Sequence, residues 1–168
     1  MILVTHGIVG GAIGRFLPTH PILAFALGFL SHFVIDAIPH WHYPLTSIEE
    51  DTQNPLNNDL PVTKKAIRDF FAIGVDCLSG ILIALYFLKG DFSMDTAFIS
   101  IVAGALGGIV PDALQFVYWK WRREPLVSLQ KFHLYIHSKM NIDDQYLVGI
   151  TTQTTFAILV IWITNILT

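Results

Sequence analysis

Long apolar segments limit what this chain can fold into. The sequence contains five of them: Ile2–Phe16, Pro21–Ile38, Ala66–Leu88, Thr96–Trp119 and Tyr146–Leu167. A straight transmembrane helix needs about 20 apolar residues, and the last three segments meet this length. The first two are shorter and lie close together, which favours a tight hairpin that is tilted or partly re-entrant. We therefore predict an all-α, polytopic membrane helical bundle of about five spans.

The composition points to the same class of protein. Of the 168 residues, 53% are hydrophobic and 14% are charged, whereas soluble domains carry about 25% charged residues. The net charge of −3 gives the chain no general attraction to nucleic acid. The single cysteine, Cys77, excludes an intramolecular disulfide. No internal repeat or low-complexity tract is visible, so residues 1–168 are predicted to form one membrane-embedded helical domain.

Two polar stretches interrupt the apolar pattern. Residues Trp41–Thr63 are rich in proline and acidic side chains and predict a loop, with Thr63 as the cap of the next helix. The second stretch, Lys120–Gln145, contains the amphipathic string Leu126–His137, which predicts an interfacial helix. The glycines of the first apolar segment have small-residue spacing, so another helix is expected to pack closely against it.

Lysine and arginine predict the orientation. With five crossings, the amino terminus and both polar stretches share one side of the membrane. That side carries Lys64, Lys65, Arg68, Lys120, Arg122, Arg123, Lys131 and Lys139. The other side has Arg15 and Lys89. The positive-inside rule places the first side in the cytoplasm, which predicts a multi-pass protein of the inner (plasma) membrane.

Imidazoles and carboxylates gather near this same side. His32 and Asp36 are one helical turn apart at the end of the second segment. Ionisable groups at membrane depth are expensive and usually mark function, and histidine with aspartate is a typical metal-ligand set. The candidate ligands are His6, His32, Asp36, His40, Asp112, His133 and His137. We predict a cytoplasm-facing centre of one to three divalent ions, with zinc as the best match.

Simpler explanations exist for each of these residues. His32 and Asp36 would also form a neutral hydrogen-bonded pair that links helices. His6 would also suit a helix start at the membrane–water interface. His133 and His137 would also line the polar face of an amphipathic helix. His42 is interpreted as an interfacial loop residue. Asp112 is harder to explain in this way, because Gly107-Gly108-Ile-Val-Pro111 predicts an opened backbone just before it.

Other polar residues supply candidate roles in catalysis. Asp76 lies deep in the third segment and is expected to face the site, where it would orient a histidine or bridge ligands. Asp76 or Asp36 is the candidate general base. Arg122 and Arg123 are close to the site in sequence and are candidates to hold a substrate phosphate. Their alternative role is to set topology and bind anionic lipid.

A metal centre of this kind predicts a reaction. A divalent ion with an open position lowers the pKa of a bound water to about 7, which favours hydrolysis of a phosphoester, with a phosphorylated membrane lipid as the expected substrate. Two other classes stay open. One is a metal transporter, which needs a polar path across the whole bilayer. The other is a structural or partner-binding membrane protein whose histidines form only hydrogen bonds.

Several short motifs resemble a family of small bacterial and archaeal inner-membrane proteins called membrane-bound metal-dependent hydrolases, one group of which is under SOS (LexA) control. The similar features are Thr5-His6 followed by glycines, Gly104-Ala-Leu-Gly-Gly-Ile-Val-Pro-Asp112, and His133 with Ile136-His137-Ser138. That family is distantly similar to zinc-dependent phospholipase C, in which a His-x-x-x-Asp helix like His32–Asp36 ligates zinc. The resemblance implies His6, His32, Asp36, Asp112 and His137 as ligands. The chain departs from the family pattern at Leu114, where a second aspartate is usual.

Overall fold

The structure, a computed structural model, describes residues 2–140 and 144–168, and its regular secondary structure in these ranges is helical. It contains six α-helices, one short 3₁₀-helix and no strand within the described part of the chain. The elements are α1 Leu3–Phe16, α2 Pro21–Asp36, η1 Pro55–Asn57, α3 Lys64–Leu88, α4 Thr96–Lys120, α5 Leu126–Ile136 and α6 Tyr146–Leu167. The predicted all-α class is confirmed.

The helices fall into two length classes. In the described residues, three helices are long and apolar enough to cross a membrane, and these are α3, α4 and α6 with 25, 25 and 22 residues. In contrast, α1 and α2 have 14 and 16 residues. At 1.5 Å per residue, the short pair is about 21–24 Å long beside neighbours of about 33–38 Å.

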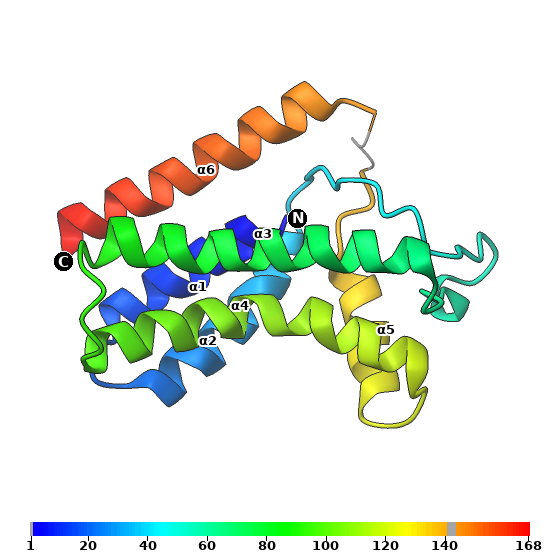
Figure 1. Cartoon of the computed structure of the whole chain (residues 1–168), viewed down its shortest axis with the longest axis horizontal. Coiled ribbons are helices and arrows are strands. Elements are labelled where there is room, and N and C mark those ends of the chain that lie inside the picture. The colour runs from blue at the N-terminus through cyan, green and yellow to red at the C-terminus, as the bar shows by residue number, and fades with distance from the viewer. Residues whose placement is uncertain (1, 141–143) are drawn as a thin grey trace.

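The short helix α1 lies inside the bundle and packs against α2, α3, α4 and α6 (Figure 1). Glycine makes this arrangement possible. A Cβ on Gly104 of α4 would lie 2.1 Å from the carbonyl oxygen of Gly10 in α1, closer than any side chain allows. The predicted close packing of the glycine-rich first segment is therefore confirmed, and it fixes α1 against the helix that carries Asp112.

The outer surface of the long helices is apolar. Large apolar side chains are exposed on α3 at Ile67, Phe71, Val75, Leu78 and Leu82. Their spacing of three and four residues places them on one face of the helix. An exposed apolar stripe of this length would promote aggregation in water, whereas a bilayer solvates it. The surface therefore agrees with the membrane class that the composition indicates.

The connecting segments lie at two opposite ends of the bundle (Figure 1). The long loop after α2 and the helix α5 lie at one end, and the turn before α2, the α3–α4 loop and the carboxyl terminus lie at the other. The loop is anchored to α3 by Asp69, whose carboxylate accepts hydrogen bonds from the backbone and hydroxyl of Ser47. Thr63 caps α3 by accepting from the Ala66 amide at 3.4 Å, as predicted.

One prediction about the backbone is wrong. The helix α4 runs without a break through Pro111, although proline lacks the N–H that a helix interior uses. The preceding glycines serve close packing instead. A Cβ on Gly107 would lie 2.2 Å from the Phe25 carbonyl of α2, and one on Gly108 would lie 2.4 Å from the His6 carbonyl of α1. The short helices therefore press against α4 just before Asp112.

Candidate metal centre

Four side chains from three helices meet where α2 ends and α1 begins. Asp112 comes from α4, and His133 comes from α5. His32 and Asp36 close α2, and their spacing of i, i+4 places both on one helical face. One ligand atom from each of these four residues lies within 4.8 Å of the others, a group that could hold a metal ion. We call His32, Asp36, Asp112 and His133 the helix cluster.

The distances within the helix cluster fit a tetrahedral ion. The Nε2 atom of His32 lies 3.3 Å from Nε2 of His133, 3.1 Å from Oδ2 of Asp36 and 3.6 Å from Oδ1 of Asp112. The Nε2 atom of His133 lies 3.0 Å from the same Asp36 oxygen and 3.9 Å from the same Asp112 oxygen. Bonds of about 2.0–2.2 Å to a tetrahedral zinc place ligand atoms about 3.3–3.6 Å apart. The five distances bracket this value.

A backbone carbonyl orients His32 for ligation. Its Nδ1 lies 2.8 Å from the carbonyl oxygen of Gly108. A carbonyl only accepts hydrogen bonds, so Nδ1 carries the proton and, in the neutral ring, Nε2 keeps its lone pair. Histidines that ligate metals usually have such a partner on the other ring nitrogen. The Nε2 atom of His32 therefore points its lone pair into the helix cluster.

The helix cluster is buried on one side and open on the other. His32, Asp36 and His133 are 0%, 1% and 4% exposed, and a buried carboxylate is costly unless it is paired. The side chain of Asp112 is 30% exposed. Access to the helix cluster is therefore on the side of Asp112.

A second group of histidines lies beside the first. His40 and His42 come from the loop after α2, and His137 directly follows α5. One ring nitrogen of each lies within 4.8 Å of the others, so this group could also hold a metal ion. The Nε2 atoms of His40 and His42 are 2.9 Å apart. We call His40, His42 and His137 the loop trio.

The loop trio also has features that favour ligation. The Nδ1 of His40 lies 2.6 Å from the Ile38 carbonyl, and the Nδ1 of His137 lies 3.2 Å from the Ser138 carbonyl. Both rings therefore present Nε2 as the lone-pair atom. Burial lowers the pKa of His40 to about 3 and also lowers the pKa of His137. These two imidazoles are neutral at pH 7, which is the form that binds metal.

His6 lies between the two groups. Its Nε2 is 3.1 Å from Oδ1 of Asp36, and its ring stacks on His32 with a centroid distance of 4.0 Å. The residue is 0% exposed. Within the described part of the chain, neither ring nitrogen of His6 has a hydrogen-bond partner of acceptable geometry. A buried imidazole in this condition calls for an explanation, and a nearby cation would supply one.

All seven predicted ligands are thus gathered in or beside these two groups, and their role as ligands stays a prediction. Reasoning from the sequence missed His42, which was interpreted as an interfacial loop residue. The signal was the His40-x-His42 spacing directly after Pro39. In an extended segment, residues two apart project to the same side, so such a pair can bind one ion.

The structure places Asp76 at the start of α1. Its two carboxylate oxygens accept hydrogen bonds from the backbone N–H groups of Leu3 and Val4, at 2.8 and 3.1 Å. No side chain of α1 itself caps this end, so Asp76 caps it from α3. This corrects the expectation that Asp76 faces the ligands: it holds the helix that carries His6. Its role as general base stays a prediction without geometric support.

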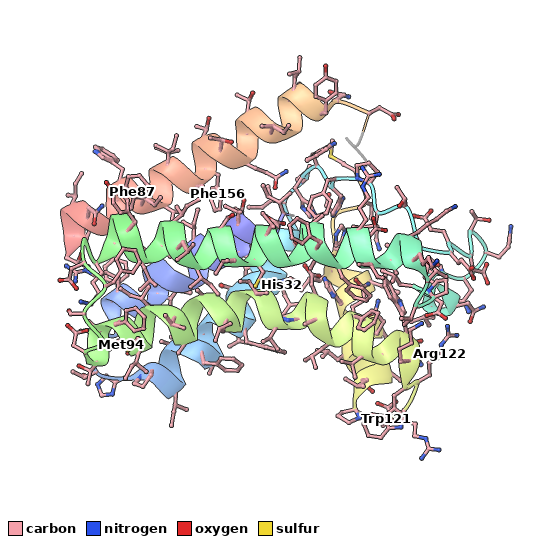
Figure 2. All side chains as sticks on the ribbon, in the orientation of Figure 1. His32, Phe87, Met94, Trp121, Arg122 and Phe156 are labelled. Atoms are coloured by element: carbon pink, nitrogen blue, oxygen red, sulfur yellow. The ribbon has the colours of Figure 1, made fainter. Side chains whose placement is uncertain are left out.

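Arg122 is not brought to the clusters. Its guanidinium donates hydrogen bonds to the carbonyl oxygens of Asn57 and Asn58, at 3.0 and 3.2 Å. Figure 2 shows Arg122 at the end of the molecule and His32 near the middle. Arg123 follows it in an exposed loop. Arg122 thus holds the loop in this structure, and the role of Arg122 and Arg123 in holding a substrate phosphate stays a prediction.

Chemically, the two groups bring together five imidazoles and two carboxylates in a site with one open side. Such a donor set suits zinc or a similar divalent ion. Comparisons with known proteins add no further constraint: no family model, no curated protein and no solved structure matches this chain.

Proposed function

We propose that this protein is a membrane-embedded metal-dependent hydrolase that acts on a phosphoester, with a phosphorylated membrane lipid as its substrate. The observation that carries the proposal is the geometry of the helix cluster, in which two imidazoles and two carboxylates from separate helices converge within 4.8 Å. The five distances between ligand atoms are close to the edge length of a tetrahedron around one zinc ion. Hydrogen bonds between neutral groups alone would not require this.

The chemistry follows from the donor set. A divalent ion held by the four residues of the helix cluster would need a fifth coordination position for water, and there it would lower the pKa of that water to about 7 and supply Lewis-acid polarisation of a phosphoryl oxygen. Among the cluster's carboxylates, Asp112 is better placed than Asp36 to accept the proton from that water. The Asp112 side chain is 30% exposed, whereas both oxygens of Asp36 already face imidazoles.

The topology that we propose has α3, α4 and α6 crossing the bilayer, with α1 and α2 as a shorter hairpin beside them. The five helices then give about five spans, and the site lies below the membrane surface, at the level where the hairpin ends. The lysine and arginine distribution supports a cytoplasmic location for this end, in the inner membrane. A site at this depth meets a lipid head group more readily than a soluble substrate.

Apolar neighbours support a lipid substrate. Val117 follows Asp112 on α4, Phe132 precedes His133 on α5, and both are exposed. In this proposal the acyl chains of the substrate would contact exposed apolar surface of this kind on α4 and α5. A lipid substrate would place its phosphate at the helix cluster and its acyl chains against apolar side chains and the bilayer.

The test is metal content followed by turnover. Wild-type protein, His32→Ala and Asp112→Ala would be purified in detergent, checked for intact folding, and analysed for metal. Each would then be assayed for phosphate release from a panel of phosphorylated lipids. His20→Ala is the matched control, because His20 is an exposed histidine before α2, at the other end of that helix.

The expected result is full metal content in the wild type and His20→Ala, less metal in the two other variants, and lipid-dependent phosphate release only where the metal content equals that of the wild type. Equal metal in all four proteins would refute the ligand assignment. Bound metal without release from any phosphoester would refute hydrolysis and favour metal transport.

A further inference from the structure

The two oxygens of Asp36 face different partners. Oδ2 lies 3.1 Å from His32 Nε2 and 3.0 Å from His133 Nε2, both in the helix cluster. Oδ1 lies 3.6 Å from His40 Nε2, which belongs to the loop trio. One carboxylate thus touches both groups through separate atoms. This is the arrangement by which a carboxylate joins two metal ions.

We propose that the loop trio is a second metal site, and that Asp36 bridges the two ions of a dinuclear centre. The second ion would be held by His40, His42 and His137 together with Oδ1 of Asp36. This inference rests on the metal site of the proposed function but not on its hydrolytic activity. It adds His42, which neither the sequence motifs nor the resemblance selects.

Hydrogen bonds hold the residues of the loop trio next to one another. The backbone N–H of Ser138 donates to the carbonyl oxygen of Asp36 at 2.9 Å, which ties the end of α5 to the end of α2. His137 is therefore held beside the loop that carries His40 and His42. The ring centroids of His40 and His137 are 4.8 Å apart, and those of His42 and His137 are 5.3 Å apart.

Charge gives a further reason for a cation at this place. His6 Nε2 lies 3.1 Å from the same Asp36 oxygen that faces the loop trio, and its Nδ1 has no hydrogen-bond partner among the described residues. Two imidazoles, those of His6 and His40, thus face one carboxylate oxygen of Asp36. A divalent ion satisfies lone pairs that these rings cannot satisfy with one another.

A dinuclear centre would also define the reaction class more narrowly. Paired ions about 3.5–4 Å apart stabilise both the attacking and the leaving oxygen of an in-line displacement at phosphorus. The loop trio would then contribute to turnover of a phosphoester and not only to structure.

The first test counts ions. Wild-type protein, His42→Ala, His133→Ala and the control His20→Ala would be equilibrated with zinc at controlled free concentration and analysed for zinc per chain. We expect about two ions in the wild type and His20→Ala, and about one in His42→Ala and in His133→Ala. One ion in the wild type, with no loss in His42→Ala, would overturn the second site.

The second test needs no variant. Wild-type protein would be titrated with cobalt(II) and followed by electron paramagnetic resonance. Ions bridged by a carboxylate couple magnetically, so the signal per cobalt is expected to fall as the second ion binds. A signal per cobalt that stays constant would overturn the bridge.

These outcomes are separable from the proposed function. Two coupled ions without phosphate release would refute hydrolysis and retain the dinuclear centre. One ion with phosphate release would refute the dinuclear centre and retain hydrolysis.

Discussion

The helix cluster and the loop trio use similar side chains on different backbones. His32, Asp36, Asp112 and His133 all project from helices, and three of the four are almost fully buried. The loop trio takes two histidines from a connecting segment and a third from the residue after α5. Helix packing thus fixes the first set, whereas local hydrogen bonds fix the second. The difference predicts that the helix cluster holds its ion more tightly.

The two groups also differ in charge. The helix cluster contains two carboxylates, Asp36 and Asp112, whereas the loop trio consists of imidazoles and shares Asp36. An anionic ligand set attracts a divalent cation more strongly than imidazoles alone. The loop trio therefore depends on Asp36 of the helix cluster for negative charge. The helix cluster has Asp112 as well and should depend less on the loop trio.

Removing the shared charge should have the largest effect. Asp36→Asn keeps the shape of the side chain but removes the anion that faces both groups. The affinity for each ion should fall at least about tenfold, since even partners that do not touch the metal contribute that much. The measurement is zinc binding at equilibrium.

Asp91→Asn is the control, because Asp91 is an exposed carboxylate paired with Lys89 at the other end of the bundle. Unchanged zinc affinity in Asp36→Asn would place Asp36 outside both sites.

A change in helix packing should separate the two groups. In Gly104→Ala the new Cβ would lie 2.1 Å from the Gly10 carbonyl, so α1 and α4 must move apart. Overpacking of this kind costs about 1–3 kcal/mol of stability. The helix cluster should lose zinc affinity because Asp112 is on α4, while the loop trio should keep most of its affinity.

The measurements are denaturant unfolding in detergent and zinc titration. Gly74→Ala is the matched control, since nothing lies within 4 Å of a Cβ there. It should stabilise α3 by about 0.5–1 kcal/mol. If both variants behave alike, close packing does not hold the helix cluster in place.

The smallest effect is expected at Asp76. Asp76→Asn weakens the cap on Leu3 and Val4 and should cost about 1 kcal/mol of stability. Phosphate release should stay close to the wild-type rate, because the carboxylate binds backbone and not substrate. The readouts are unfolding and the pH profile of turnover.

Asp95→Ala removes a comparable cap, the one on Phe98 at the start of α4, far from the site. The two variants should match in stability loss. A drop in turnover of about 100-fold or more in Asp76→Asn alone would instead identify a general base.

Local sequence patterns predicted the helices well. The segment Tyr146–Leu167 has the same limits in the sequence and in the structure, and the amphipathic string from Leu126 became α5. Apolar periodicity and capping act over a few residues, so they can be recognised without a structure. The ligand pair His32 and Asp36 was visible for the same reason, since one helical turn joins them.

Contacts between distant residues were not predictable in this way. The hydrogen bond from Leu3 to Asp76 joins residues 73 positions apart, and the one from Arg122 to Asn57 joins residues 65 apart. Nothing local shows that Asp76 would cap α1 or that Arg122 would hold a loop. His42 was missed because its partner His137 is brought near only when α5 docks on the end of α2.

The central claim is that imidazoles and carboxylates from separate helices bind one ion, and zinc K-edge X-ray absorption on the loaded wild-type protein tests it most directly. The account predicts a first shell of nitrogen and oxygen at about 2.0–2.1 Å with outer-shell scattering from imidazole rings. A shell without imidazole, a sulfur ligand at about 2.3 Å from Cys77, or no stoichiometric zinc would contradict it.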